Sequence, residues 1–187
     1  MVLAGPILLA ATNPRPGLHW LEVGGIAAWA VCWSLENLAD FQMRSFVSAA
    51  KKNGDIRTAV LGHGAYAGPE YWLWAKCRHP NYFFEWMCWN SFVLAAVPSA
   101  ADLIADPAQG LGAKLGAAVA LVYTSRIFYD CLVHWTGAAP AESRSVTRRP
   151  AYKEHQASTR VLFPFEAPFF DHYRVPGWPL SSDKWQN

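Results

Sequence analysis

The alternation of long apolar stretches with basic stretches is the feature that most constrains this chain. Three windows are mostly apolar: Leu18–Leu38, Phe83–Ala105 and Leu111–Trp135. Roughly 20 such residues in a helix, rising 1.5 Å each, cover a bilayer core of about 30 Å. We therefore predict an all-α integral membrane bundle of about three transmembrane helices, with amphipathic loop segments and an extended C-terminal tail.

The basic residues are distributed unevenly along the chain. Of the 16 Lys and Arg residues, 13 lie in residues 44–78 and 144–184. Threading the three windows through a membrane places both stretches on one side, as the positive-inside rule requires. A soluble helical bundle with apolar core helices is the alternative. The net charge of +2 is too small to favour a nucleic-acid partner.

Polar residues inside or beside the windows form a predicted intramembrane stripe. Charges are costly in lipid, so they tend to face the protein interior or a wet cavity. We expect Arg126 and Asp130, four residues apart, to be buried and charge-compensated. The stripe either holds the helices together or lines a ligand pocket open to the basic side. Its members are Glu36, Tyr123, Arg126, Asp130 and His134.

Three motifs occur in order between about residues 25 and 165. Residues 36–42 read ENLADFQ, residues 78–85 read RHPNYFFE, and residues 149–155 read RPAYKEH, with Glu142 before them and Phe163-Pro164 after them. Together they resemble the steroid 5α-reductase-like membrane superfamily, whose signature is RHPNYFGE. The resemblance implies the helical fold of that superfamily.

The resemblance also implies a chemistry, in which NADPH is held by the C-terminal helices and a hydride passes to a carbon-carbon double bond of a sterol or other lipid. Isoprenylcysteine methyltransferases share the RHPxY turn, so methyl transfer from S-adenosylmethionine is a weaker alternative. Those enzymes typically carry paired glutamates before the closing segment, whereas Glu142 stands alone. The residues that match cofactor-side positions are Asp40, His79, Asn81, Tyr82, Glu85, Arg148, Arg149 and Tyr152.

No residue is assigned a catalytic role, and no metal site is expected, because the Cys and His residues lack ligand spacing. The chain departs from the superfamily pattern at Phe84, where the signature has Gly, and at His155, where the closing segment has Tyr. Only about seventeen residues precede the first predicted helix, so we expect the substrate-side half to be absent. These departures favour an accessory subunit of a membrane complex, with a lipid or nucleotide retained in its cleft. An NADPH-dependent lipid reductase is the alternative.

The chain divides into a predicted transmembrane domain, residues 1–165, and an interaction tail, residues 166–187. The tail combines prolines with aromatic residues, a composition suited to lying across another subunit. Membrane lipids and the other subunits of a complex are the expected partners. The predicted location is the mitochondrial inner membrane, where large membrane assemblies are common, with the endoplasmic reticulum as the alternative.

Overall fold

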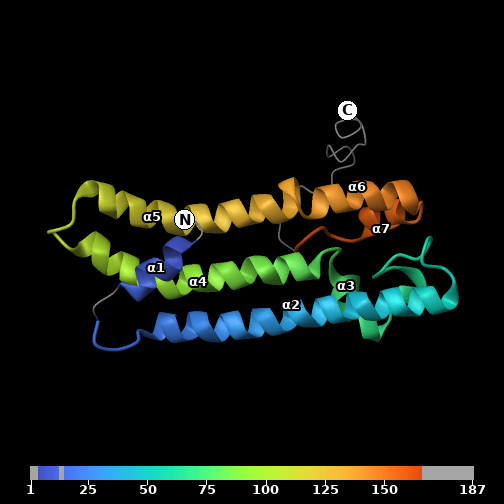
Figure 1. Ribbon diagram of the computed structural model, residues 1–187, viewed down its shortest axis with the longest axis horizontal. Coiled ribbons are helices and arrows are strands. Elements are labelled where there is room, and N and C mark those ends of the chain that lie inside the picture. The colour runs from blue at the N-terminus through green and yellow to red at the C-terminus, as the bar shows by residue number, and fades with distance from the viewer. Residues whose placement is uncertain (1–3, 13–14, 166–187) are drawn as a thin grey trace. The chain divides into compact units, whose positions relative to one another are not determined.

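The computed structural model describes residues 4–12 and 15–165, and every regular element in these ranges is helical (Figure 1), which confirms the all-α prediction. The predicted tail, residues 166–187, lies outside the described residues. The long helices are α2 (Trp20–Asn53), α4 (Pro80–Ala105) and α5 (Leu111–Asp130). The short elements are α1 (Gly5–Ala11), η2 (Gly64–Tyr66), η3 (Pro69–Tyr71), α3 (Trp72–Lys76), the π-helical turn η4 (Cys131–Trp135), α6 (Ala138–Arg148) and α7 (Tyr152–Ser158).

Two of the described helices are long and apolar enough to cross a membrane. They are α4 and the helical run Leu111–Arg148, which contain the second and third predicted windows. Helix α2 contains most of the first window but is not apolar enough, so two of the three predicted spans have the length and composition of a membrane helix. Glu22 and Glu36, together with the Trp and Gly residues between them, lower the mean hydropathy of α2.

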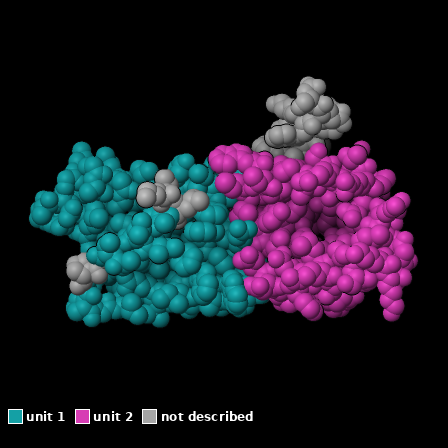
Figure 2. Space-filling model, viewed as in Figure 1, with its two compact units in different colours: residues 1–34, 84–130 teal, residues 35–83, 131–187 magenta. Residues whose placement is uncertain are grey.

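The chain forms two compact units, coloured separately in Figure 2. Unit 1 comprises residues 1–34 and 84–130, and unit 2 comprises residues 35–83 and 131–187. Helices α2 and α4 each contribute residues to both units.

Unit 1 is held together by close helix contacts. At Gly25 of α2, any Cβ atom would lie 2.7 Å from the backbone oxygen of Ser91 in α4, so only glycine permits this approach. Between α4 and α5, the rings of Trp89 and Phe128 stack with centroids 4.0 Å apart. Helix α1 packs on α5, with Gly5 close to the methyl group of Ala120.

The predicted polar stripe is divided between the units. In unit 1, Arg126 Nε donates to Asp130 Oδ2 at 2.8 Å, so the expected pairing is observed. The expected burial of Arg126 is wrong, because its side chain is 69% exposed. The buried face of α5 carries Ala117 and Thr124, and at about 100° per residue Arg126 lies about 200° from Thr124. The other members are Tyr123, exposed in unit 1, and Glu36 and His134, half-buried in unit 2.

Unit 2 has an aromatic core on the second half of α2. The ring of Phe46 meets Tyr66 and Tyr71 edge-on, with centroids 4.9 and 6.3 Å apart. Both tyrosines come from the short elements that follow α2. The indole of Trp74 in α3 donates to the Ala39 carbonyl at 2.9 Å. These contacts hold the segment that connects α2 to α4 against the second half of α2.

A second connection in unit 2 joins the turn before α4 to the segment after α7. The backbone amides of Arg78 and His79 donate to the carbonyls of Arg160 and Val161 at 2.8 and 3.0 Å. The ring of Phe83 packs edge-on against Phe163. Segments about 80 residues apart in the chain are therefore held side by side.

Candidate functional site

Unit 2 contains a cavity of about 290 Å³. Six apolar side chains from α2, the following loop and α3 form one part of its lining, and polar side chains from the turn before α4, α4, α6 and α7 form another. A cavity with an apolar part and a few polar groups suits a small organic ligand that has both apolar and polar parts. The lining consists of Met43, Phe46, Val47, Val60, Leu61, Trp74, Arg78, His79, Asn81, Tyr82, Ala141, Ser145, Arg149, Tyr152 and His155.

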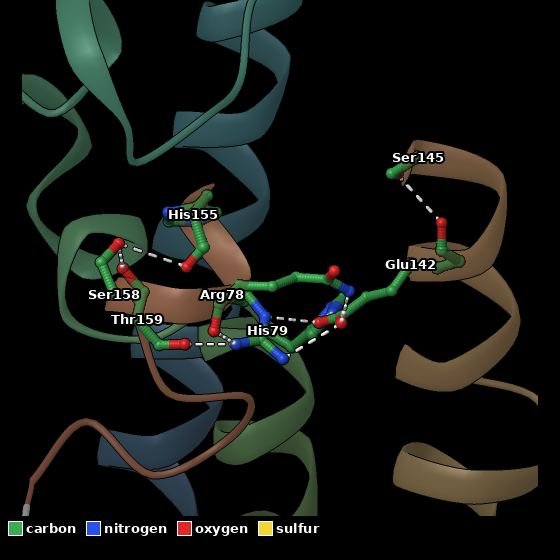
Figure 3. Close-up of polar contacts among 9 residues, drawn as sticks. Arg78, His79, Glu142, Ser145, His155, Ser158 and Thr159 are labelled. Carbon is green, nitrogen blue, oxygen red and sulfur yellow. Dashed lines mark hydrogen bonds and ion pairs between the residues drawn. The ribbon is translucent and has the colours of Figure 1, made fainter. Parts of the chain in front are cut away.

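A buried ion-pair cluster shares Arg78 and His79 with this lining (Figure 3). Arg78 donates through Nε to Glu142 Oε1 at 2.7 Å and through Nη2 to Oε2 at 3.0 Å, which is a bidentate pair. His79 Nε2 donates to Oε1 at 2.9 Å. Glu142 is fully buried, and both other residues are nearly so. A carboxylate buried this completely requires such partners to remain charged.

Further hydrogen bonds complete the cluster. Gln156 Nε2 donates to Glu142 Oε2 at 2.7 Å, so each carboxylate oxygen accepts two bonds. Arg78 Nη1 donates to the backbone carbonyls of Gln156 and Thr159. The guanidinium of Arg78 is thus engaged by protein groups, and its main role is to join α6 and α7 to the start of α4.

Three other side chains of the lining carry a buried polar atom without a hydrogen-bond partner. These atoms are Asn81 Oδ1, Arg149 Nε and His155 Nδ1. The amide of Asn81 is oriented by its donor bond to Asp40 Oδ1 at 3.2 Å, and Arg149 Nη2 donates to the Ile56 carbonyl at 3.3 Å. Buried polar atoms are nearly always paired, so three orphans on one cavity make it the candidate ligand site of the described residues.

His155 is the most deeply buried of the three residues, with 1% of its surface exposed. Its ring lies 5.5 Å from that of His63 and 5.8 Å from that of Tyr152. Burial, followed by the positive charge of Arg78, lowers the pKa of His155 to about 4, although Glu142 acts in the opposite direction. His155 is therefore neutral at pH 7. Burial and then the charge of Glu142 raise the pKa of Tyr152 above its ordinary value, so its phenol stays protonated.

The lowered pKa of His155 predicts a pH-dependent stability. An unfolded histidine with a pKa near 6.5 binds a proton that the folded protein excludes down to about pH 4. We expect the wild type to lose at most about 3 kcal/mol of unfolding free energy from this group as the pH falls through that window. His155→Leu should lack this component. Denaturant unfolding in detergent from pH 7.5 to 4 measures the difference, and parallel curves for the two proteins would contradict the assignment.

Five of the eight residues that resemble cofactor positions line the cavity: His79, Asn81, Tyr82, Arg149 and Tyr152. Asp40 supports the site indirectly, through Asn81. Arg148 is exposed and does not line the cavity, and Glu85 belongs to unit 1.

Four residues of the site were not predicted from the sequence: Arg78, Glu142, His155 and Gln156. The first three lie within or beside the quoted motifs, so their places in the motifs could have identified them as site residues. Within residues 4–12 and 15–165, no group of three His, Cys, Asp or Glu residues is arranged to hold a metal ion.

Comparison with known proteins gives one family match. Neither curated proteins nor solved structures provide a match. The family model described as "Protein of unknown function (DUF1295)" matches residues 1–159 of the 187. This match covers all of the cavity lining and both candidate membrane helices, and the chain therefore belongs to the DUF1295 family.

Proposed function

We propose that this chain is an integral membrane protein whose unit 2 cavity binds one end of NADPH, and that it reduces a carbon-carbon double bond of a lipid. The observation that carries the proposal is the set of unpartnered buried atoms on the lining, Asn81 Oδ1, Arg149 Nε and His155 Nδ1. The reaction class comes from the motifs that resemble the steroid 5α-reductase-like superfamily.

The lining fits a nicotinamide nucleotide chemically. Asn81 Oδ1 requires a donor, and Arg149 Nε requires an acceptor. The carboxamide, ribose hydroxyls and phosphates of the cofactor supply both kinds of group, and its flat rings suit the apolar part around Phe46. At about 290 Å³, the cavity is at the lower end of the range for ligand pockets, about 300–1,000 Å³, so it accommodates a part of the dinucleotide.

Each polar residue then has a binding role. Arg149 would hold a phosphate or carbonyl oxygen, and Asn81, oriented by Asp40, would accept from a carboxamide or hydroxyl. The Arg78–Glu142 pair keeps α6 and the start of α4 together, and both helices supply lining residues. NADPH, when bound, would supply the hydride for the reduction, and water would supply the proton that completes the saturated bond.

The exposed apolar surface supports the membrane part of the proposal. The most apolar windows of the two candidate spans are only 39% and 28% buried within the described structure, whereas the core helix of a soluble protein is mostly buried. In unit 1, large apolar side chains face outward on α2 and α5: Val23, Ile26, Val31, Trp33, Leu115, Val119 and Val122. Lipid would cover this surface. The choice between the mitochondrial inner membrane and the endoplasmic reticulum stays a prediction.

NADPH binding is expected to depend on Arg149. Replacing it with glutamine removes a charge-assisted hydrogen bond of about 1.5–3 kcal/mol, so the dissociation constant should rise about 10- to 150-fold. Arg144→Gln is the matched control, because Arg144 is exposed on α6 and is not part of the lining. Titration of the purified protein in detergent, followed by tryptophan fluorescence, measures both. Equal affinities for the two variants would contradict the proposed site.

The accessory subunit remains the second proposal. It is supported by the departures from the superfamily pattern at Phe84 and His155, the expected absence of the substrate-side half, and the Pro- and aromatic-rich segment 166–187, which lies outside the described residues. A subunit of this kind would assemble with partner chains in the membrane without turning over a lipid. Purified wild type that shows no saturable NADPH binding would favour this second proposal over the reductase.

A further inference from the structure

The Nδ1 atom of His155 is buried and has no hydrogen-bond partner among the described residues. The side chain is 1% exposed, so water does not hydrate it freely, and the residue lines the unit 2 cavity. A buried imidazole nitrogen is unfavourable unless another group forms a hydrogen bond with it. The missing partner is therefore expected on the cavity side.

The polar groups around His155 have their hydrogen bonds elsewhere. Arg78 donates to Glu142 and to two backbone carbonyls, and Glu142 accepts from Arg78, His79 and Gln156. Tyr152 on the same helix and His63 on the loop after α2 make only ring contacts with His155, and His63 lies 3.8 Å from Glu154. The described structure thus offers Nδ1 no partner of its own.

We propose that His155 is a cofactor-binding residue whose Nδ1 bonds an uncharged polar group of the nucleotide, a hydroxyl or the carboxamide. This inference rests on the proposed NADPH binding and adds a residue to it. Arg149 supplies the positive charge on the lining that suits a phosphate, whereas a neutral imidazole suits a neutral partner.

The lowered pKa of His155 agrees with an uncharged partner. Burial favours the neutral ring, and the nearby positive charge of Arg78 adds to this effect, although Glu142 acts in the opposite direction. A neutral imidazole presents one N–H group and one lone pair, so either tautomer can serve a hydroxyl or an amide. Nδ1 carries the proton if the ligand group accepts a hydrogen bond, and it is unprotonated if the ligand group donates one.

Three substitutions at position 155 test the proposal, with NADP⁺ as the probe and affinity measured in detergent at pH 7.5. In His155→Asn, the amide occupies the place of Nδ1, because both lie three bonds from Cα. In His155→Gln, the amide lies one atom further out, at the place of Nε2. His155→Leu keeps the approximate volume without a polar atom. We expect the Leu and Gln variants to bind about 5- to 10-fold more weakly and the Asn variant within about 2-fold of wild type.

A pH series separates a neutral contact from a phosphate contact. If Nδ1 bonds an uncharged group, the ratio of the wild-type and His155→Asn affinities should stay constant from pH 7.5 to 5.5. A wild-type affinity that rises relative to the Asn variant as the pH falls would place a phosphate on His155 and overturn the proposal.

The remaining outcomes are also decisive. Wild-type affinity in the Leu variant, or equal losses in the Leu and Asn variants, would contradict the Nδ1 contact while leaving NADPH binding intact. Wild type without saturable NADP⁺ binding would overturn both proposals together. Thermal unfolding without ligand is the folding check: the Leu variant should be at least as stable as wild type at pH 7.5, because it lacks the unpaired nitrogen. If all three variants unfold, His155 is a structural residue and the proposal fails.

Discussion

Glu142→Ala should lower the free energy of unfolding by about 3–5 kcal/mol, the usual cost of removing one partner from a buried ion pair. The substitution leaves the guanidinium of Arg78 buried without its carboxylate and removes the acceptor for His79 and Gln156. Because Arg78 also carries the backbone link to Arg160, the turn before α4 should loosen. Thermal or denaturant unfolding of the purified protein in detergent, followed by circular dichroism, measures the loss.

A matched glutamate is available as the control. Glu154 lies on α7 in the same unit, but its side chain is 79% exposed. Its ion-pair contact with His63 is long, with 3.8 Å between Glu154 Oε2 and His63 Nε2. Glu154→Ala should change the unfolding free energy by no more than about 0.5 kcal/mol. A Glu142→Ala variant as stable as Glu154→Ala would show that the cluster of Figure 3 is not buried in the protein. Replacing Arg78 and Glu142 together with leucine should restore part of the stability, since no charge is then left unpaired.

The helical architecture follows directly from the apolar windows. The second and third windows coincide with α4 and with the run that begins at Leu111, because a long apolar segment has few alternatives to a helix. Helix α2 was harder to delimit. It continues to Asn53, well beyond the end of the first window at Leu38, because the polar residues after Leu38 are also compatible with a helix. Hydropathy did not reveal this extension, since it measures how apolar a segment is and not whether the segment is helical.

The candidate site was predictable where its residues are close in sequence. His79, Asn81 and Tyr82 lie in one motif, and all three line the cavity. The partners of Glu142 could not be predicted, because Arg78 is 64 residues away and the pair depends on the packing of α6. Arg126 shows the opposite case. Its four-residue spacing to Asp130 predicted the pair correctly, but spacing alone does not specify which face of α5 is buried.

The loop beside the cavity provides the second large effect. Gly62 has a φ of +80° and donates its N–H to the Tyr66 carbonyl at 2.9 Å. Any Cβ atom there would lie 2.1 Å from the backbone oxygen of Trp74, far inside a van der Waals contact. Trp74 cannot move without cost, because its indole is bonded to the Ala39 carbonyl and its side chain lines the cavity.

Gly62→Ala should therefore destabilise the protein by about 2–5 kcal/mol, from the left-handed backbone at about 1–2 kcal/mol and the displaced Trp74 segment at about 1–3 kcal/mol. Gly54→Ala is the control, since Gly54 has a φ of +78° but no atom within 4 Å of its Cβ position. It should cost only the backbone component, about 1–2 kcal/mol. The difference between the two unfolding free energies isolates the contact with Trp74. Equal losses of unfolding free energy would show that residue 62 makes no close contact with Trp74, and the two variants should then bind NADPH equally well. If the contact exists, only Gly62→Ala should bind NADPH more weakly than wild type.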